Sequence, residues 1–378
     1  METINKLNVL LDGRHVGTMA MHQRNLTAFE YSEAWAENGF SISPFSLPLQ
    51  AGVKISKATP FDGLFGIFED SLPDGWGRLL VDRMLRKEGE VPGEITPMQR
   101  LSIVGDTGMG ALEYVPVYET REKKEIGDLD RLADECAKVL ASEDAAELDD
   151  IDELFSLGGS SGGARPKVLT MLDGEEWIIK FPSTGDPKDI GIMEYEYNEC
   201  ARRCGIDVPE TRLFPSKKCE GYFGSKRFDR VKEQGNTLKI HMASASALLE
   251  VSHRVPALDY ASLMALTWQL TKQSKELEKM YRLMCFNVYA HNRDDHSNNF
   301  SFLCNEGNWQ LAPAYDLTYS NSIGGEHATT IDGEGRDPGI NELLSVGKRA
   351  NLKESEARNI AEEIQEIVQK DLSKYLSK

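Results

Sequence analysis

The chain has 378 residues, of which 40% are hydrophobic, so it can bury more than one core and is expected to form roughly two to three folding units. With 61 acidic and 43 basic residues its net charge is −18, which argues against binding of nucleic acid or of an anionic membrane by the surface as a whole. No apolar stretch reaches the ~18 residues that a membrane helix needs, and the N-terminus lacks a signal-peptide pattern. The six cysteines contain no Cys-x-x-Cys pair. These features predict a cytoplasmic protein with reduced thiols and no membrane association.

The first 120 residues have the pattern of a mixed α+β module. Two short strand-like runs, 7–11 and 15–19, flank Asp12-Gly13, and an Asp-Gly pair supplies the positive φ angles of a tight hairpin. Further on, apolar side chains spaced three to four residues apart predict a helix over 76–86.

An acidic segment follows between Glu119 and Glu153. Apolar residues recur every three or four positions from Leu129 to Leu140, which predicts one amphipathic helix. The charge run Glu143–Glu153 favours a solvated linker, with a docking surface as the alternative.

Four glycines and two serines lie between Leu157 and Lys167. Such a segment can turn sharply and present backbone N–H groups to a phosphate, although glycine-rich loops are also common as flexible connections. No Lys-Ser or Lys-Thr follows the last glycine, so the segment does not match the phosphate loop of nucleoside triphosphatases.

The next segment strengthens the phosphate interpretation. Runs 168–172 and 176–181 predict a second hairpin with Lys180 inside an apolar strand, and protein kinases also place a phosphate-binding strand lysine after a glycine-rich loop. A following helix offers Glu194 as a partner for that lysine. Phe228 comes after a further strand, where a kinase hinge would run beside adenine.

The second half is predicted to be rich in α-helix. Apolar residues recur at helical intervals from Leu263 to Val288 and again from Ala357 to Val368. The first of these stretches leads directly into a polar motif.

That motif, Asn292–Asn299, has the spacing of a phosphoryl-transfer loop. Asp294 follows an arginine and precedes Asn299 by five positions, and Asp316 comes further on. Asp294 is the predicted base that orients an attacking hydroxyl, while Asn299 and Asp316 supply hard oxygen ligands for Mg²⁺.

Two other interpretations apply to the same loop. Imidazole and carboxylate groups of His291, Asp294, Asp295 and His296 could bind a transition metal for hydrolysis. Alternatively, the segment is a polar turn closed by Asp and Asn side chains. The first alternative gives no role to Asn299, to Asp316 or to the glycine-rich loop, so a kinase is favoured.

Taken together, these motifs resemble those of the HipA family, bacterial serine/threonine kinases that act as the toxin of toxin–antitoxin pairs. The resemblance depends on Ser160–Lys167, Ile179–Pro182, Arg227–Arg230, Asn292–Asn299 and Tyr315–Leu317, and in the N-terminal module on Ser46–Leu49, Phe68–Gly75 and Gly108–Leu112.

The resemblance implies an α+β, two-lobed protein-kinase-like fold with an N-terminal module (1–120), a kinase N-lobe (121–240) and an α-helical C-lobe (241–378). It implies ATP and Mg²⁺ as cofactors, protein substrates that include aminoacyl-tRNA synthetases, and a helix-turn-helix antitoxin of HipB type that would make the DNA contacts. Ser160 matches the serine that the family autophosphorylates to switch the kinase off, although the adjacent Ser161 leaves the choice of hydroxyl open. The expected ATP-binding residues are Ser161, Gly162, Gly163, Ala164, Arg165, Lys167, Lys180, Arg227, Phe228, His296, Asn299 and Asp316.

Two features qualify this interpretation. Lys226 stands where an acidic residue can precede Arg-Phe-Asp-Arg, which leaves the contact on the adenine side open. The alternative from a different functional class is a regulatory scaffold that binds ATP and an antitoxin without transferring phosphate.

Overall fold

The computed structural model divides the chain into two compact units. One contains Met1–Ile192 and Thr211–Met242, and the other contains Met193–Glu210 and Ala243–Lys378. The finer division into three segments stays a prediction. The structure describes residues 3–23, 26–118, 127–142, 151–233, 235–322 and 324–376.

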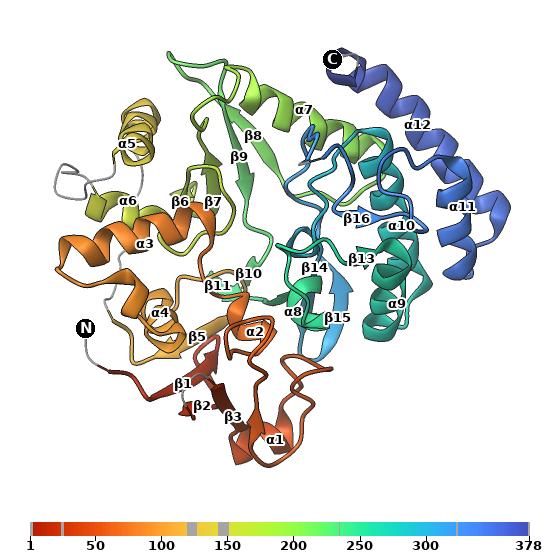
Figure 1. The fold of residues 1–378 in the computed structure, drawn as a ribbon. Coiled ribbons are helices and arrows are strands. Elements are labelled where there is room, and N and C mark those ends of the chain that lie inside the picture. Colours follow the sequence, from red (N-terminus) through yellow and green to blue (C-terminus); the bar gives the residue numbers. More distant parts are fainter. Residues whose placement is uncertain are drawn as a thin grey trace. The chain divides into compact units, whose positions relative to one another are not determined.

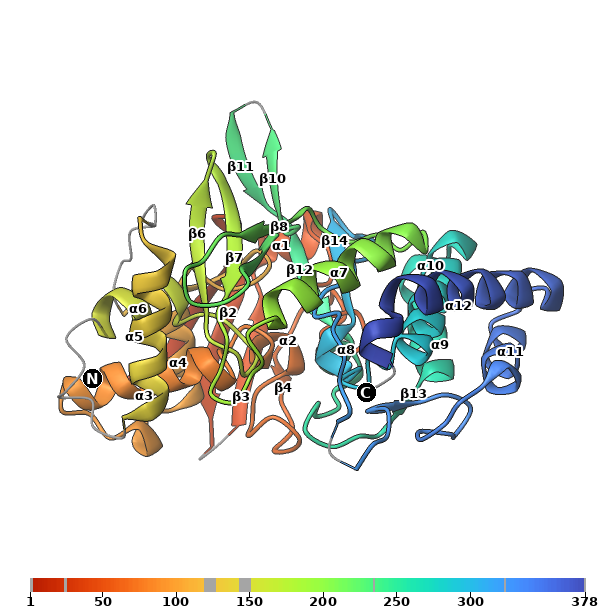
Figure 2. The same cartoon turned by 90° about the horizontal axis from the view of Figure 1, so that it is seen from above.

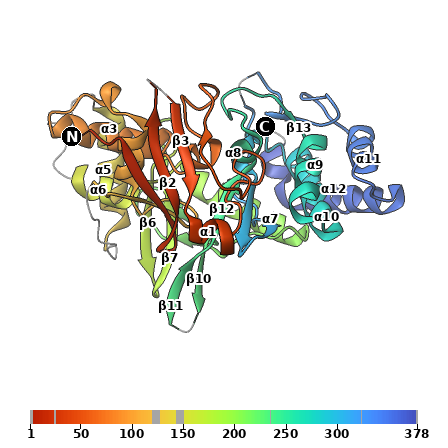
Figure 3. The same cartoon turned by 90° about the horizontal axis from the view of Figure 1, so that it is seen from below.

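The first unit begins with an antiparallel five-stranded sheet (Figures 1 and 3). Its strands, in spatial order, are β4 (Lys54–Ile55), β3 (Leu26–Tyr31), β2 (Arg14–His22), β1 (Lys6–Leu11) and β5 (Leu112–Val115). The predicted hairpin is confirmed, and both Asp12 and Gly13 have positive φ in the β1–β2 turn. Alternate residues such as Val9, Met19 and Phe29 are fully buried, as expected for a sheet with one covered face.

Helices and a 3-10 turn complete the N-terminal part of this unit. They are α1 (Glu33–Asn38), α2 (Gly66–Glu69), α3 (Gly75–Lys87), a 3-10 turn (Pro92–Glu94), α4 (Pro97–Val104), α5 (Leu129–Ala141) and α6 (Ile151–Gly158). The predicted helices over 76–86 and around Leu129–Leu140 are confirmed as α3 and α5.

The linker interpretation of Glu143–Glu153 is only partly testable. Residues 119–126 and 143–150 lie outside the described residues, whereas 151–153 form the first turn of α6. The linker prediction is wrong for this turn, because Ile151 and Phe155 of α6 are buried in the core that α3 also lines.

A second sheet includes the hairpin of β6 (Lys167–Leu172) and β7 (Glu175–Lys180), which Figure 2 shows, and Lys180 is the last residue of β7. The strand order of this sheet is β6, β7, β9 (Tyr222–Lys226) and β8 (Thr211–Phe214), and all neighbours are antiparallel. The predicted β6–β7 hairpin is confirmed, with Asp173 and Gly174 in its turn. A separate hairpin of β10 (Arg230–Glu233) and β11 (Asn236–Lys239) was not predicted, because its mostly polar residues lack strand-like alternation.

The second unit is mainly helical, as predicted. Its elements are the greater part of α7 (Ile190–Arg203), α8 (Ala245–Leu249), α9 (Tyr260–Thr271), α10 (Ser274–Tyr289), α11 (Ile340–Arg349) and α12 (Glu354–Leu376), with β13 (Leu258–Asp259), β14 (Ser301–Asn305), β15 (Asn308–Leu311) and β16 (Thr329–Thr330). The chain passes between the units at β12 (His241–Ser244).

Helix α7 differs from the expectation in one respect. The prediction includes it in the segment 121–240, whereas the division of the structure into two units assigns its residues from Met193 onwards to the second unit. The buried Tyr197 explains this placement, because its hydroxyl donates to the Ala290 carbonyl (2.8 Å) and its ring packs 5.8 Å from that of Tyr375.

The structure also describes the cysteines and the helices long enough to be compared with a membrane span. All six cysteines are free thiols. Within the described ranges, no helix has the length and apolar character required to cross a membrane.

Candidate active site

The glycine-rich loop begins where α6 ends, at Gly158. Both serines of the loop are buried and donate to backbone carbonyls: Ser161 Oγ to Gly158 (2.6 Å) and Ser160 Oγ to Thr107 (3.0 Å). Thr107 belongs to the N-terminal module, so that module holds the hydroxyl predicted to be phosphorylated. Gly163 has φ of +82°, which favours glycine at this position.

Two of the basic residues that are predicted to contact ATP form hydrogen bonds with protein groups in or near the loop. Lys167 Nζ donates to the Gly162 carbonyl, and Arg165 Nε donates to Asp186 Oδ2 (3.1 Å). These bonds stabilise the loop backbone, and the predicted ATP contacts of the two residues stay predictions.

Lys180 is the last residue of β7. Its Nζ lies 5.6 Å from the centre of the Phe223 ring on the neighbouring strand β9, within range of a cation–π interaction. Glu194 is buried in the second unit, and its pairing with Lys180 stays a prediction. Lys226, which replaces the expected acidic residue, forms an ion pair with Glu175 (2.6 Å).

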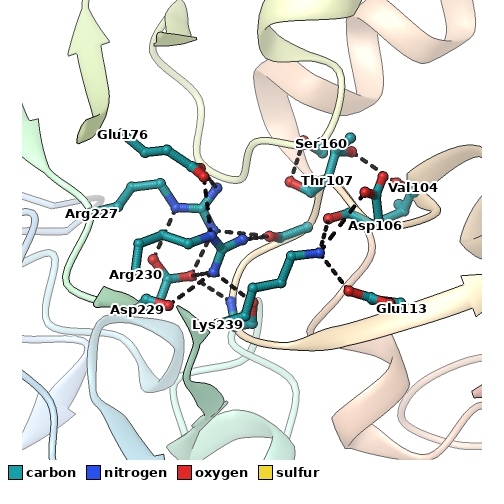
Figure 4. A network of polar contacts seen from close by, with 12 residues as sticks. Val104, Asp106, Thr107, Glu113, Ser160, Glu176, Arg227, Asp229, Arg230 and Lys239 are labelled. Carbon is teal, nitrogen blue, oxygen red and sulfur yellow. Dashed lines mark hydrogen bonds and ion pairs between the residues drawn. The ribbon is translucent and has the colours of Figure 1, made fainter. Parts of the chain in front are cut away.

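Arg227 lies in a buried network (Figure 4). Its Nε and Nη2 donate to the two carboxylate oxygens of Asp229 (2.9 and 2.6 Å), and Nη1 donates to Glu176 (3.2 Å). Arg230 Nη1 donates to the same Asp229 (2.9 Å) and to the Gly110 carbonyl (2.8 Å).

This network connects the second sheet to the N-terminal module. Arg227 Nη2 donates to the Gly108 carbonyl (2.9 Å), while the Gly110 N–H donates to Asp229 (2.6 Å). Burial by itself would raise the pKa of Asp229, but the two guanidinium groups outweigh it and lower the pKa to about 2. The ATP contacts predicted for Arg227 and the partly exposed Phe228 stay predictions.

In the second unit, the segment Asn292–Asn299 follows α10 and is fixed by Asp295. This carboxylate is almost fully buried and accepts from Tyr260 Oη (2.9 Å) and from the backbone N–H groups of Ala328 (2.8 Å) and Thr329 (3.2 Å). The side chain of His327 contacts it through Nδ1 (2.9 Å). The adjacent Asp294 has a side chain that is 60% exposed. Of the two consecutive aspartates, therefore, one fixes the loop and the other faces solvent.

The predicted metal ligands lie on segments that are bonded to each other. Tyr315, just before Asp316, donates from its hydroxyl to the carbonyl of Asn298, just before Asn299. Asn299 Nδ2 donates to the Asp294 carbonyl (2.6 Å), which leaves the amide oxygen of Asn299 as its possible metal-binding atom.

His296 is held inside the same loop. Its Nδ1 accepts from the Asn298 N–H (3.3 Å), and its Nε2 lies 3.9 Å from Asp294 Oδ1. Its ring centre lies 5.5 Å from that of His253. The ATP contact predicted for His296 stays a prediction.

The donor chemistry of this loop fits Mg²⁺. A carboxylate and an amide oxygen are the hard ligands that Mg²⁺ accepts while it keeps waters and phosphate oxygens in its shell. Among the described residues, Asn298 Oδ1 and Ser297 Oγ of this loop are buried polar atoms without a hydrogen-bond partner, so either atom could bond to a ligand or to water. The part of the chain described here contains no group of three or more His, Cys, Asp or Glu side chains placed to share a metal ion, so the transition-metal interpretation has no support.

The sequence interpretation gave no role to the residues that hold Asp295 and connect the segments of the predicted metal ligands. These are Tyr260, Tyr315, His327 and Thr329. Tyr315 lies in the motif Tyr315–Leu317, whereas only the folded chain brings Tyr260, His327 and Thr329 to the loop.

Comparison with known proteins identifies the family. The model of the HipA N-terminal domain matches residues 7–115, and that of the HipA-like C-terminal domain matches residues 159–372. The chain belongs to the HipA family.

Two Sinorhizobium fredii (strain NBRC 101917 / NGR234) relatives, Y4mE and Y4dM, carry kinase in their names. Y4mE is 28% identical over 388 residues, covering 94% of this chain and 84% of the relative. Y4dM is 24% identical over 389 residues, covering 96% and 86%.

A solved structure supports the fold. HipA of Shewanella oneidensis MR-1, from its complex with HipB and operator DNA, superposes with a TM-score of 0.71 at 17% identity, over 98% of this chain and 91% of that one. The predicted α+β fold of HipA type is therefore confirmed.

Proposed function

We propose that this HipA-family chain is an ATP- and Mg²⁺-dependent serine/threonine protein kinase. Family membership and the kinase names of the two relatives support the reaction class. The observation that carries the proposal is the arrangement around Asp294: an exposed carboxylate next to a buried one, Asp295, which fixes the loop from several sides.

Four residues and the glycine-rich loop would have separate roles in phosphoryl transfer. Asp294 accepts the proton of the attacking hydroxyl and orients it, which requires a fixed backbone and an accessible carboxylate. Asn299 and Asp316 would hold Mg²⁺, which supplies charge neutralisation at the phosphates when bound. Lys180 and the N–H groups of the glycine-rich loop would bind phosphate oxygens.

We further propose that the chain is the toxin of a toxin–antitoxin pair. The Shewanella relative was solved with HipB and operator DNA, and a chain with a net charge of −18 would leave DNA contacts to such a helix-turn-helix partner. A protein target such as an aminoacyl-tRNA synthetase is the proposed substrate.

Autophosphorylation of Ser160 is the proposed off-switch. Its hydroxyl now donates to the Thr107 carbonyl, and a phosphate there would lose that donor and carry about −2 charge beside a carbonyl oxygen. This change would remove the bond between Ser160 and Thr107, which is one of the bonds that hold the loop on the N-terminal module.

The proposal is tested by incubating the purified chain with Mg²⁺, γ-labelled ATP and a bacterial lysate. A kinase labels itself or a lysate protein, and the Asp294→Asn and Asp316→Asn variants label neither. If the unaltered chain binds ATP but labels nothing, the alternative of a nucleotide-binding scaffold replaces the proposal.

A further inference from the structure

Asp74 is the N-cap residue of α3, yet its side chain makes no capping bond to its own helix. Instead, Asp74 Oδ1 accepts the backbone N–H of Gly163, at the tip of the glycine-rich loop. In return, the Trp76 N–H in the first turn of α3 donates to the Gly163 carbonyl (2.9 Å). The loop thus takes over part of the capping of α3, and α3 binds the loop.

Glycines on both sides make this contact possible. A Cβ on Gly75 would lie 2.5 Å from the Gly163 carbonyl oxygen, and a Cβ on Gly77 would lie 2.1 Å from that of Ser161. Gly75 and Gly163 also have positive φ, at +41° and +82°. The two backbones can approach this closely because Gly75, Gly77 and Gly163 have no side chains. The contact therefore depends on these glycines.

Further bonds place the contact beside the predicted phosphate-binding backbone. Trp76 Nε1 donates to the Lys167 carbonyl (3.0 Å), and Lys167 Nζ donates to the Gly162 carbonyl. A Cβ on Gly162 would lie 3.1 Å from Asp74 Oδ1, so the carboxylate is adjacent to both glycines. The loop is therefore held by hydrogen bonds with α3 and with the side chain of Lys167.

The Asp74 carboxylate is an anion bonded to a backbone N–H that a phosphate would also use. We infer that Asp74 is a positioning residue that holds the glycine-rich loop on α3 and competes with the phosphates of the nucleotide for the Gly163 N–H. This inference rests on the proposed function, since it assumes that the loop binds phosphates. A nucleotide must displace the carboxylate, and the two negative charges also repel each other.

The isosteric variant Asp74→Asn tests the competition. An amide oxygen is a weaker acceptor than a carboxylate and carries no charge, so the affinity for MgATP should rise at least about fivefold. The affinity for adenosine, which has no phosphates, should not change. A purely structural role would alter both ligands together or neither.

The binding assay is isothermal titration of the full chain with MgATP and with adenosine. Glu94→Gln is the matched control, because it removes one exposed negative charge from the same module, in the 3-10 turn Pro92–Glu94. Unchanged or weaker MgATP binding by Asp74→Asn, or an equal gain by Glu94→Gln, overturns the inference.

Hydrogen exchange separates this inference from the proposed function. Without any nucleotide, Asp74→Asn should accelerate exchange in peptides that cover 160–165, and Glu94→Gln should not. If the unaltered chain binds no ATP but its loop is released by Asp74→Asn, the kinase proposal fails while the holding role stands. If exchange in the loop is unchanged, the holding role is refuted.

Discussion

Replacement of Asp229 with asparagine should destabilise the first unit, because this residue neutralises two buried arginines. Asp229 has no exposed surface, and its carboxylate accepts from Arg227, from Arg230 and from the Gly110 N–H. The asparagine keeps the shape but removes the charge. The guanidinium groups of Arg227 and Arg230 then keep their ion pairs with Glu176, which is labelled in Figure 4.

The size of the effect follows from the pKa of Asp229. Its pKa falls from 3.8 to about 2 in the folded chain, so ionisation there stabilises the fold by about 2 kcal/mol at neutral pH. Because the folded-state pKa is the lower one, this stabilisation is present above pH 3.8 and is lost as the pH falls towards 2. A loss of about 2 kcal/mol corresponds to a decrease in Tm of roughly 4–8 °C for a unit of this size.

The assay is thermal unfolding followed by tryptophan fluorescence at pH 7, with Asp173→Asn as the control. The Asp173 side chain is 79% exposed and pairs with Arg212 at the surface, so its replacement should change stability by less than about 0.5 kcal/mol. A Tm of Asp229→Asn equal to that of the unaltered chain would show that the network is not a buried, charge-balanced cluster.

Three further outcomes are expected. His241 is buried, and burial lowers the pKa of its imidazole from 6.5 to about 4, so the unfolded chain takes up a proton first and stability falls as the pH decreases between these values. Urea unfolding should lose about 2 kcal/mol from pH 7 to 5, and His241→Gln should reduce that loss; an equal loss in the variant contradicts the assignment. Ser160→Ala should lack one phosphate by intact mass after incubation with MgATP, whereas an unchanged count excludes Ser160. Tyr260→Phe removes a donor to Asp295 and should cost about 1–3 kcal/mol of stability by chemical denaturation; a cost below about 0.5 kcal/mol would remove Tyr260 from the account.

Local patterns predicted most of the regular structure. The Asp-Gly turns and the helical spacing of apolar residues placed both hairpins and the main helices, because turn chemistry and amphipathic burial are encoded within a few residues. Local patterns gave the wrong prediction for Ile151–Glu153, because the acidic residues there suggested a solvated linker. The apolar side of this turn is buried by contacts with α3 and the second sheet, which the local sequence does not indicate.

The candidate site was less predictable than the fold. The spacing of Asp294 and Asn299 marks a loop but does not indicate which of two adjacent aspartates is buried, since that depends on Tyr260 and Thr329 from distant segments. Likewise, a strand followed by Arg-Phe-Asp-Arg was interpreted as a nucleotide contact. That contact stays a prediction, and the structure adds the bonds of Arg227 to the N-terminal module, which sequence spacing cannot show.

The central claim is that Asp294 performs proton transfer rather than nucleotide binding. The most direct test measures MgATP affinity and the rate of phosphoryl transfer for the unaltered chain and for Asp294→Asn. The account predicts a dissociation constant within about twofold and a transfer rate lower by about 10²–10⁴-fold. An Asp294→Asn variant that transfers phosphate at the unaltered rate would contradict the account.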